Sequence, residues 1–279
     1  MPNTAEKRRT FRKLHESGCF VIPNPWDLGS ARYLQGLGFQ ALATTSSGFA
    51  FSQAYADGAV PLDTVLAHFR TLATGSDLPI NADFEHGFAP DPDGVARNVR
   101  RCIETGVAGL SIEDSTGDKA QPIFPLSEAV TRLRAARRAI DESGEDVLLV
   151  GRAEGLLVGH GDLDEVVARL QAYAGAGADV LYAPKLRTRE EIARVIAAVA
   201  PKPVNFLNSV DFGFSVADLA AMGVRRISVG GTLARVAWTA FSRAAREIAE
   251  QGTFSTFAGS IANAELNAFF AQDRTKQVS

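Results

Sequence analysis

Two acidic pairs stand at the ends of short apolar segments, and their spacing predicts a cation site. Asp83 and Glu85 lie at the end of the segment 79–83, and side chains two residues apart on a strand point to the same face. Glu113 and Asp114 end the next apolar segment. Carboxylates gathered at the ends of successive strands suit a hard cation, so we expect Mg²⁺ or Mn²⁺ there. Either pair by itself would also fit a helix cap or a solvated rim, and only the two together favour the metal.

A guanidinium and a run of small residues complement these acids. Arg152 follows the fifth apolar segment and carries a planar fork of donors that matches a substrate carboxylate. Ser46, Ser47 and Gly48 follow the second segment and offer hydroxyls and approachable backbone N–H groups for an anion or an enolate oxygen. Since Mg²⁺ keeps several waters, one or two direct carboxylates suffice. The set suits a small oxo acid that chelates the metal, which would stabilise an enolate.

The elements that must position these residues recur along the chain. Stretches with apolar residues three and four apart follow each of eight short β-type segments, at 19–23, 41–45, 79–83, 109–113, 147–151, 180–183, 203–207 and 226–229. Glycines in the helix-to-strand turns, as in Gly36-Leu37-Gly38, fit left-handed helix ends before buried strands. The pattern predicts an α/β fold of the (β/α)₈ barrel class, in which chemistry lies in the loops after the strands. A doubly wound open sheet is the alternative.

Composition favours one barrel domain with a tail. The chain has 279 residues, 46% of them hydrophobic, and no linker rich in Pro, Gly or Ser divides it, so we expect a single domain over 1–279. Residues 252–279 form a C-terminal extension with too much apolar surface to leave in water, from Phe254, Phe257, Leu266, Phe269 and Phe270. We expect this extension to pack as an extra helix on its own barrel or on that of a neighbouring subunit.

Charge and cysteine content limit the partners and the setting. The net charge of −3 does not indicate nucleic-acid binding, and we expect the basic run 7–9 and the helix with Arg132, Arg134, Arg137 and Arg138 to be solvated. We expect Cys19 and Cys102 to be small core residues rather than a disulfide or a metal cluster. The polar start and the lack of a long apolar stretch predict a cytoplasmic protein with no membrane partner.

Several of these motifs, in this order, resemble those of the isocitrate lyase/phosphoenolpyruvate mutase superfamily. The matching residues, between about Phe20 and the C-terminus, are Ser47-Gly48, Asp57, the segment 83–87, Ile112-Glu113-Asp114 and Gly151-Arg152. The resemblance implies that Asp83 is the direct Mg²⁺ ligand and that three further acids hold metal-bound waters: Asp57, Glu85 and Glu113. It implies that Arg152, Ser47, Gly48 and the backbone of Phe49 bind the oxo acid. It also implies a homo-oligomer, a dimer or more usually a tetramer, with the C-terminal helix swapped between subunits.

The loop after the fourth segment departs from the family pattern. Lyases of the family carry a Lys-Lys-Cys-Gly-His loop whose cysteine is the acid–base group, whereas residues 115–122 here contain no cysteine. This disfavours a cysteine-dependent isocitrate or methylisocitrate lyase. The mutases place a lysine and an asparagine in this loop; Lys119 matches the first, but Gln121 stands near the second. The family's Arg-Thr-Asp reads Arg152-Ala153-Glu154 here, which changes the pocket. The chain thus resembles the decarboxylase-like branch.

The sequence therefore predicts a Mg²⁺-dependent carbon–carbon lyase or decarboxylase acting on a small 2-oxo or 2-hydroxy dicarboxylic acid through an enolate. The candidate catalytic residues are Asp57, Lys119 and Arg152. The candidate substrate-binding residues are Ser46, Ser47, Gly48, Phe49, Asp83 and Arg152, with Asn205 and Asn208 after the seventh segment.

Other interpretations of the same residues stay open. A phosphonopyruvate-type mutase or hydrolase would need a further basic group near Ser47-Gly48, and a catalytically silent barrel would bind the oxo acid without turnover. Lys185 could form a Schiff base with a keto acid. Gly230-Gly231 could hold a phosphate or form a tight entry into the last barrel helix. His160 could donate a proton or lie on a surface loop.

Overall fold

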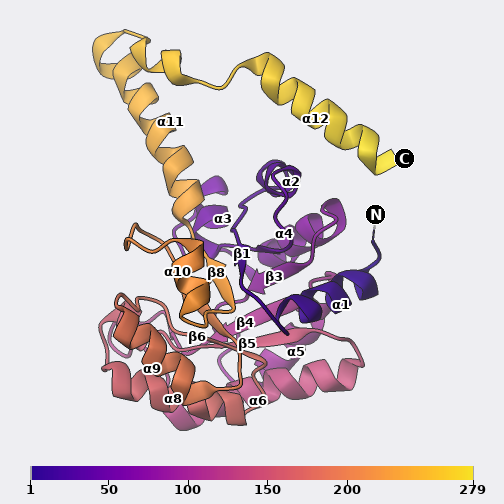
Figure 1. Ribbon diagram of the computed structural model, residues 1–279, viewed down its shortest axis with the longest axis vertical. Helices are drawn as coiled ribbons and strands as arrows, with labels where there is room; N and C mark the ends of the chain where they lie inside the picture. The colour runs from indigo at the N-terminus through magenta and orange to yellow at the C-terminus, as the bar shows by residue number, and fades with distance from the viewer. Residues whose placement is uncertain (1, 279) are drawn as a thin grey trace.

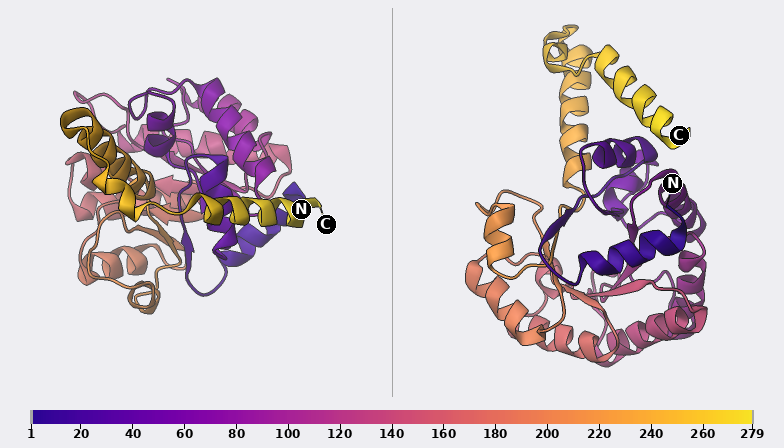
Figure 2. Two further views of the ribbon diagram at one scale, coloured as in Figure 1. Left: turned by 90° about the horizontal axis from the view of Figure 1, so that it is seen from above. Right: turned by 45° about the vertical axis from the view of Figure 1, so that its right-hand side comes forward.

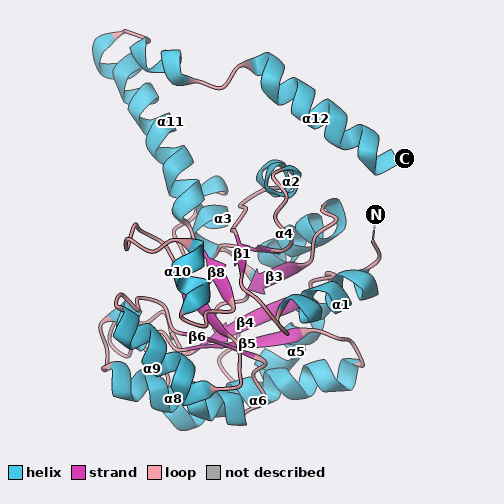
Figure 3. Cartoon of the chain, viewed as in Figure 1, coloured by secondary structure: helices cyan, strands magenta, loops and turns pink. Residues whose placement is uncertain are grey.

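Eight parallel strands form a nearly closed barrel in the computed structural model, which describes residues 2–278, with the side chains of 274–278 left out (Figure 1). The strand order is β1-β8-β7-β6-β5-β4-β3-β2. A backbone hydrogen bond of 3.1 Å from Ala43 to the carbonyl of Pro23 links the two outer strands of that order. Helices cover the outside of the sheet (Figure 3). The predicted (β/α)₈ class is confirmed, and the open sheet is excluded.

The strands are β1 (Phe20–Ile22), β2 (Leu42–Ala43), β3 (Ile80–Asp83), β4 (Gly109–Glu113), β5 (Leu148–Arg152), β6 (Val180–Tyr182), β7 (Val204–Leu207) and β8 (Arg226–Ser228). The helices are α1 (Thr4–Leu14), α2 (Leu28–Gly36), α3 (Ser46–Ser52), α4 (Leu62–Gly75), α5 (Pro92–Ile103), α6 (Leu126–Ser143), α7 (Gly155–Val158), α8 (Leu163–Gly175), α9 (Arg189–Val199), α10 (Val216–Ala221), α11 (Thr232–Gln251) and α12 (Asn263–Val278), with a 3₁₀ turn η1 (Ser255–Gly259). No helix among residues 2–278 is long and apolar enough to span a membrane.

Several strands place polar side chains on the inner face of the barrel. Because strand side chains alternate between faces, Asn81 and Asp83 of β3 share the inner face, as do Arg226 and Ser228 of β8. The register places Tyr182 beside Asn205 and Asn205 beside Arg226. Polar side chains from distant parts of the chain therefore meet inside the barrel.

Helix α1 closes the N-terminal end of the barrel. Asn3 and Glu6 begin it with reciprocal hydrogen bonds of 2.8 and 2.9 Å between their side chains and backbone N–H groups. Phe11 is fully buried beneath β1. A Cβ on Gly109 would approach the Phe11 ring to 2.7 Å, so only glycine leaves room for the ring at that position. Access to the barrel interior is thus from the C-terminal ends of the strands.

Some basic residues expected in solvent are buried instead. The ammonium of Lys7 donates to the carbonyls of Ala73 and Ser76, at 2.7 and 2.5 Å. Arg8 Nε donates to the carbonyl of Val107, at 3.0 Å, and Arg132 Nη2 donates to that of Ala89, at 2.5 Å. The prediction of solvated faces is wrong for these three residues, because loop and helix-end carbonyls need donors and long basic side chains reach them.

The C-terminal segment leaves the barrel and returns to it. Helix α11 projects away from the strands, and α12 runs back toward α2, so that both ends of the described chain lie close together (Figures 1 and 2). Arg32 of α2 donates to both carboxylate oxygens of Asp273, at 2.8 and 2.6 Å. The ring of Phe269 lies 4.8 Å from that of Tyr33. In this structure the helical extension contacts its own barrel.

The buried histidine under the barrel makes stability depend on pH. Burial, and then Arg226, lower the pKa of His15 to about 3, and its Nδ1–H donates to the Phe11 carbonyl at 2.7 Å. The pKa of His15 is lower in the folded state than in the unfolded state. As the pH falls below about 6.5, His15 therefore binds a proton in the unfolded state but not in the native state, and the free energy of unfolding decreases. Glutamine does not titrate in this range, so we expect the free energy of unfolding of His15→Gln to fall less steeply with decreasing pH than that of wild type. The difference in slope should be about 1.4 kcal/mol per pH unit below 6.5.

The measurement is urea unfolding at pH 7.0, 6.0 and 5.0. An equal pH slope in wild type and His15→Gln would contradict the prediction, whatever the absolute stability of the variant at pH 7.0.

Candidate active site

A cavity of about 260 Å³ opens at the C-terminal ends of the strands. Its rim carries five of the residues that the sequence singles out: Ser46, Ser47, Asp57, Asp83 and Arg152. Its deeper wall carries Asn81, Ser111, Tyr182, Arg226 and Ser228, which all lie on inner faces of strands. The predicted location of the site, in the loops after the strands, thus coincides with a cavity that opens into the barrel.

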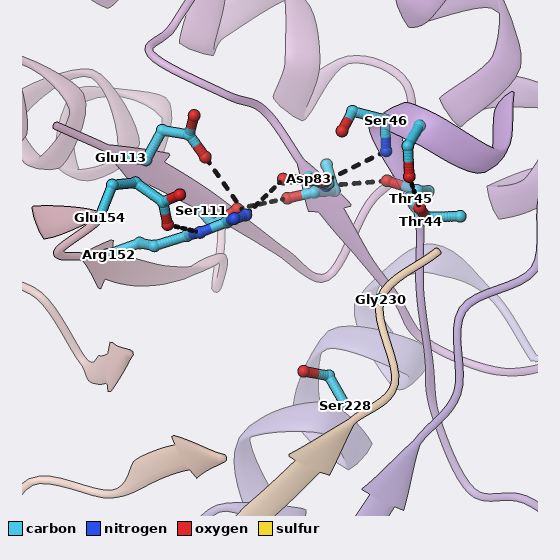
Figure 4. Close-up of polar contacts among 12 residues, drawn as sticks. Thr44, Thr45, Ser46, Asp83, Ser111, Glu113, Arg152, Glu154, Ser228 and Gly230 are labelled. Carbon is cyan, nitrogen blue, oxygen red and sulfur yellow. Dashed lines mark hydrogen bonds and ion pairs between the residues drawn. The ribbon is translucent and has the colours of Figure 1, made fainter. Parts of the chain in front are cut away.

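Asp83 is held from two sides at the centre of the site (Figure 4). Its Oδ2 accepts from the backbone N–H of Ser46 at 3.1 Å, and its own N–H donates to the hydroxyl of Thr44 at 2.8 Å. Its Oδ1 accepts from Arg152 Nη1 at 3.3 Å. The carboxylate is therefore fixed between α3 and β5, and Thr44, which follows β2, fixes the backbone.

Arg152 is a buried cation surrounded by acids. Its Nη1 lies 3.3 Å from Asp83 and 3.2 Å from Glu113, and its Nε donates to Glu154. Its Cζ stands 4.9 Å from the ring centre of Tyr182. Burial opposes the charge, but the carboxylates outweigh it and hold the pKa of Arg152 well above its ordinary value.

The acids outnumber this cation. Burial, and then Asp83 and Asp57, raise the pKa of Glu85 to about 8. Burial also raises the pKa of Glu113 well above its ordinary value, although Arg152 opposes the shift. The pKa of Asp57 is raised first by desolvation, while the Ser46 hydroxyl donates to it. One guanidinium does not neutralise these carboxyls, and the uncompensated charge is what a divalent cation would neutralise.

The donor set fits a cation that keeps much of its water. No three His, Cys, Asp or Glu side chains among residues 2–273 come together as a ready-made cage. Mg²⁺ does not require one, because it is commonly held by one or two carboxylates and several waters. Asp83 lines the cavity and could bind directly, and Asp57, Glu85 and Glu113 interact with it electrostatically. Glu85 takes a positive φ of 45°, a conformation that costs energy in a residue other than glycine.

The first turn of α3 is committed to its own hydrogen bonds. The Gly48 N–H donates to the Thr45 hydroxyl at 3.3 Å, and the Phe49 N–H donates to the Thr45 carbonyl at 3.1 Å. Both N–H groups thus have partners within the helix in this structure, and the substrate-binding role expected of these two residues stays a prediction. Gly48 serves packing: a Cβ would meet Thr45 Cγ2 at 2.7 Å and the Ala234 Cβ of α11 at 3.1 Å. The Phe49 ring stacks on His68 with 3.8 Å between ring centres.

Three other candidates lie away from the cavity surface. Lys119 is exposed in the loop after β4. An isolated antiparallel β-bridge between Ser115 and Ile123 joins the two sides of this loop. Asn205 is fully buried, with its amide bonded to Arg226 at 2.8 Å and to the Ser228 hydroxyl at 3.0 Å. Asn208 is half-buried after β7, and its Oδ1 has no partner among the described residues. The structure brings none of the three to the cavity lining.

The structure also locates the residues on which the other interpretations of the sequence depend. Asn24 Oδ1 accepts from the N–H groups of Val229 and Gly230, both at 2.9 Å, so these amides are not free to hold a phosphate. Gly231 is the N-cap residue of α11. Lys185 has a positive φ of 71° and does not line the cavity. His160 is exposed.

The cysteines are also outside the site. Cys102 is fully buried in α5, where burial raises the pKa of its thiol. Cys19 precedes β1, at the end of the barrel that α1 closes.

Sequence reasoning placed Glu154 and Tyr182 at the strand ends without assigning their contacts, and it missed Thr44. Thr44 holds the Asp83 backbone, Glu154 pairs with Arg152, and Tyr182 lies against the guanidinium. Strand alternation marks Tyr182 and Asn81 as inward, because each lies two residues from another inner position. The Thr44 contact joins the residue after β2 to β3 and has no local sequence signal.

Comparisons with known proteins agree with this geometry. The model of the family described as phosphoenolpyruvate phosphomutase matches residues 11–249. A solved structure from Burkholderia cenocepacia J2315, named as a lyase/mutase, is 45% identical, with a TM-score of 0.92, and the match covers 96% of this chain and 97% of the other. The 2-methylisocitrate lyase of Escherichia coli strain K12 is 34% identical over 187 residues, 64% of this chain and 61% of the lyase. The oxaloacetate decarboxylase of Paraburkholderia xenovorans strain LB400 is 29% identical over 204 residues, 70% of this chain and 67% of the decarboxylase.

The excess of carboxyl groups over guanidinium groups at the site predicts that a divalent cation stabilises the folded state. We expect Mg²⁺ at a hundredfold excess over its Kd to stabilise the fold by about 2.7 kcal/mol, because only the folded state gathers these carboxyls. Asp83→Asn should abolish the effect. Asp63→Asn, which removes an exposed acid of α4, should retain it. Thermal unfolding with and without Mg²⁺ measures this, and equal stabilisation of the Asp83→Asn variant would contradict the assignment.

Proposed function

The chain belongs to the isocitrate lyase/phosphoenolpyruvate mutase superfamily, and on that premise we propose that it is a Mg²⁺-dependent carbon–carbon lyase or decarboxylase for a small 2-oxo or 2-hydroxy dicarboxylic acid. The observation that carries the proposal is the buried Arg152 among Asp83, Glu113 and Glu154 at the mouth of the barrel. It joins a carboxylate-binding fork to a group of acids that outnumbers it.

Each side chain would have a distinct part in binding. A bound divalent cation would polarise the keto or hydroxyl oxygen of the substrate. Arg152 would hold a substrate carboxylate, and the hydroxyls of Ser46 and Ser47 would bond the oxygen that gains negative charge. Leu157 and Leu207, which also line the cavity, would limit water around the reacting carbons.

The lack of a nearby thiol narrows the chemistry. Neither Cys19 nor Cys102 can reach the cavity, so no cysteine among the described residues can serve as the acid–base group. When the substrate loses its carbon–carbon bond, the electron pair passes to the keto oxygen, and a proton donor then completes the product. These two steps require an electron sink at the keto oxygen and one proton donor, but no thiol.

Carbon–phosphorus chemistry is the second candidate, because the matching family is described as a phosphomutase and a basic group stands where that reaction needs one. Arg235 of α11 lines the same cavity as Ser47. A phosphonate that is turned over in preference to every dicarboxylate would favour this candidate. A catalytically silent barrel would bind oxo acids without turning over either class.

We also propose that the enzyme works as a homo-oligomer that covers α11 and η1. Large apolar side chains are exposed along this projecting segment: Val236, Trp238, Phe241, Phe254, Phe257 and Ile261. Exposed apolar surface of this kind usually marks an association surface. A second copy of the chain, with or without exchange of α12, would bury it.

The activity prediction concerns Arg152. Wild type should cleave or decarboxylate a member of a panel of 2-oxo and 2-hydroxy dicarboxylic acids, and EDTA should abolish the activity. Arg152→Lys should lower kcat/KM by roughly a hundredfold, because an ammonium cannot replace the two parallel donors of the fork. Arg70→Lys on the exposed face of α4 is the matched control and should retain full activity. Turnover that survives both EDTA and Asp83→Ala would refute the proposal.

The assembly prediction concerns the projecting helix. Phe241→Asp places a charge on a side chain that is 61% exposed in the single chain, so it should disrupt association without unfolding the barrel. Light scattering after size exclusion should show a smaller particle than wild type. Glu190→Lys, on the distant helix α9, should leave the mass unchanged. A monomeric wild type would contradict the assembly proposal.

A further inference from the structure

The floor of the cavity holds a buried cation that the proposed mechanism does not use. Arg226, the first residue of β8, is 3% exposed and lines the cavity from its deep end. Its Nε donates to the Asn205 amide oxygen at 2.8 Å, and its Nη1 donates to that of Asn81 at 3.2 Å. A guanidinium has five N–H donors, so two neutral acceptors do not saturate it.

This guanidinium has no countercharge among the side chains that the structure describes. None of their ion pairs includes Arg226, unlike the similarly buried Arg132 and Arg169, which both pair with carboxylates. Burial lowers the pKa of Arg226 to about 10, and only Tyr182 opposes the shift. An isolated buried charge costs stability, and an apolar residue of the same length would be cheaper for folding alone.

The cavity connects this charge to the predicted site. Tyr182 lies between the two guanidinium groups, because its ring faces Arg152 and its register partner Asn205 bonds Arg226. Between the rim and the floor, the wall carries the small polar residues Ser111 and Ser228. In the view of Figure 4, Ser228 lies below Asp83 and Gly230. One cavity therefore has a cation at each end and polar walls between them.

We propose that Arg226 forms an anion-binding subsite at the cavity floor and takes the second carboxylate of a dicarboxylic ligand whose first carboxylate lies at Arg152. The subsite deepens the proposed function, and its assignment to a substrate rests on that function. It makes Arg226 a specificity-determining residue that selects di-acids over mono-acids of the same class.

The subsite also limits which bond is broken. A carboxylate paired with a guanidinium is stabilised in the ground state, whereas loss of CO₂ requires its charge to leave the group. This holds for the carboxylate at Arg152 as well as for the one at Arg226. A di-acid that occupies both positions would therefore keep both carboxylates, which favours cleavage of a carbon–carbon bond elsewhere in the ligand over decarboxylation.

Binding of inert carboxylates tests the subsite without turnover. Acetate, malonate, succinate and glutarate are titrated by calorimetry at constant ionic strength in the presence of Mg²⁺. The wild type should bind at least one di-acid about tenfold or more tightly than acetate. Arg226→Met should lose this preference and should unfold at the same or a higher temperature. Arg225→Met removes the same charge one residue earlier, outside the cavity lining, and should keep the preference.

The outcomes separate the two proposals. A di-acid preference that survives Arg226→Met, or a wild type without such a preference, overturns the subsite. A preference that depends on Arg226 supports it, even in a protein that turns over no dicarboxylate and so fails the proposed function.

Two further measurements keep the test independent of one variant. Arg226→Lys retains the charge and should retain part of the di-acid preference. A crystal of the wild type with the tightest di-acid should place a carboxylate oxygen roughly 3 Å from the Arg226 guanidinium. A ligand with both carboxylates at the rim would overturn the subsite.

Discussion

The burial of Arg152 among carboxyls at one end of the barrel is the interaction on which the rest of the site depends. Asp83, Glu113 and Glu154 pair with the guanidinium, while Glu85 and Asp57 add charge that it does not neutralise. Such a concentration of like charge is costly unless a cation or a ligand compensates for it. Burial first, and then the neighbouring carboxyls, raise the pKa values of Glu85 and Glu113. A metal and an anionic substrate would compensate together, the first for the acids and the second for the arginine.

The scaffold fixes these groups through packing at both ends of the barrel. At the closed end, Phe11 fills the space that Gly109 leaves, and His15 is buried beside it between Phe11 and Phe20. At the open end, Gly48 permits α3 to approach α11, so that the Ser46 N–H reaches Asp83. Helix α11 then extends beyond the barrel with large apolar side chains exposed, which links the geometry of the site to the proposed association surface. The cavity lies between these supports, with Arg152 at its rim and Arg226 at its floor.

Much of the fold was predictable because the barrel is built from local patterns. Short apolar segments, each followed by a helical period, mark the strands β1 to β8, and the acidic ends of β3 and β4 mark the functional face. Asp83 and Arg152 meet as expected, since strand ends converge on one mouth. The partners of the Gly48 and Phe49 N–H groups were not predictable in this way, because both donate to Thr45 within the first turn of α3. Lys119 was placed by position in a loop, and loop conformation has no periodic signal.

The sequence by itself determined which side chains face inward and at which end of each strand they stand, because alternation along a strand is a local property. It also determined the excess of acids over arginine at the strand ends. Only the tertiary structure decided which inward groups share a cavity, since that depends on the register between strands that are distant in the chain. Asn205 illustrates this: the pairing of β7 with β8 places it against Arg226 rather than at the rim. Arg226 itself looks like an ordinary basic residue in the chain, and it is the closed barrel that buries it without a countercharge.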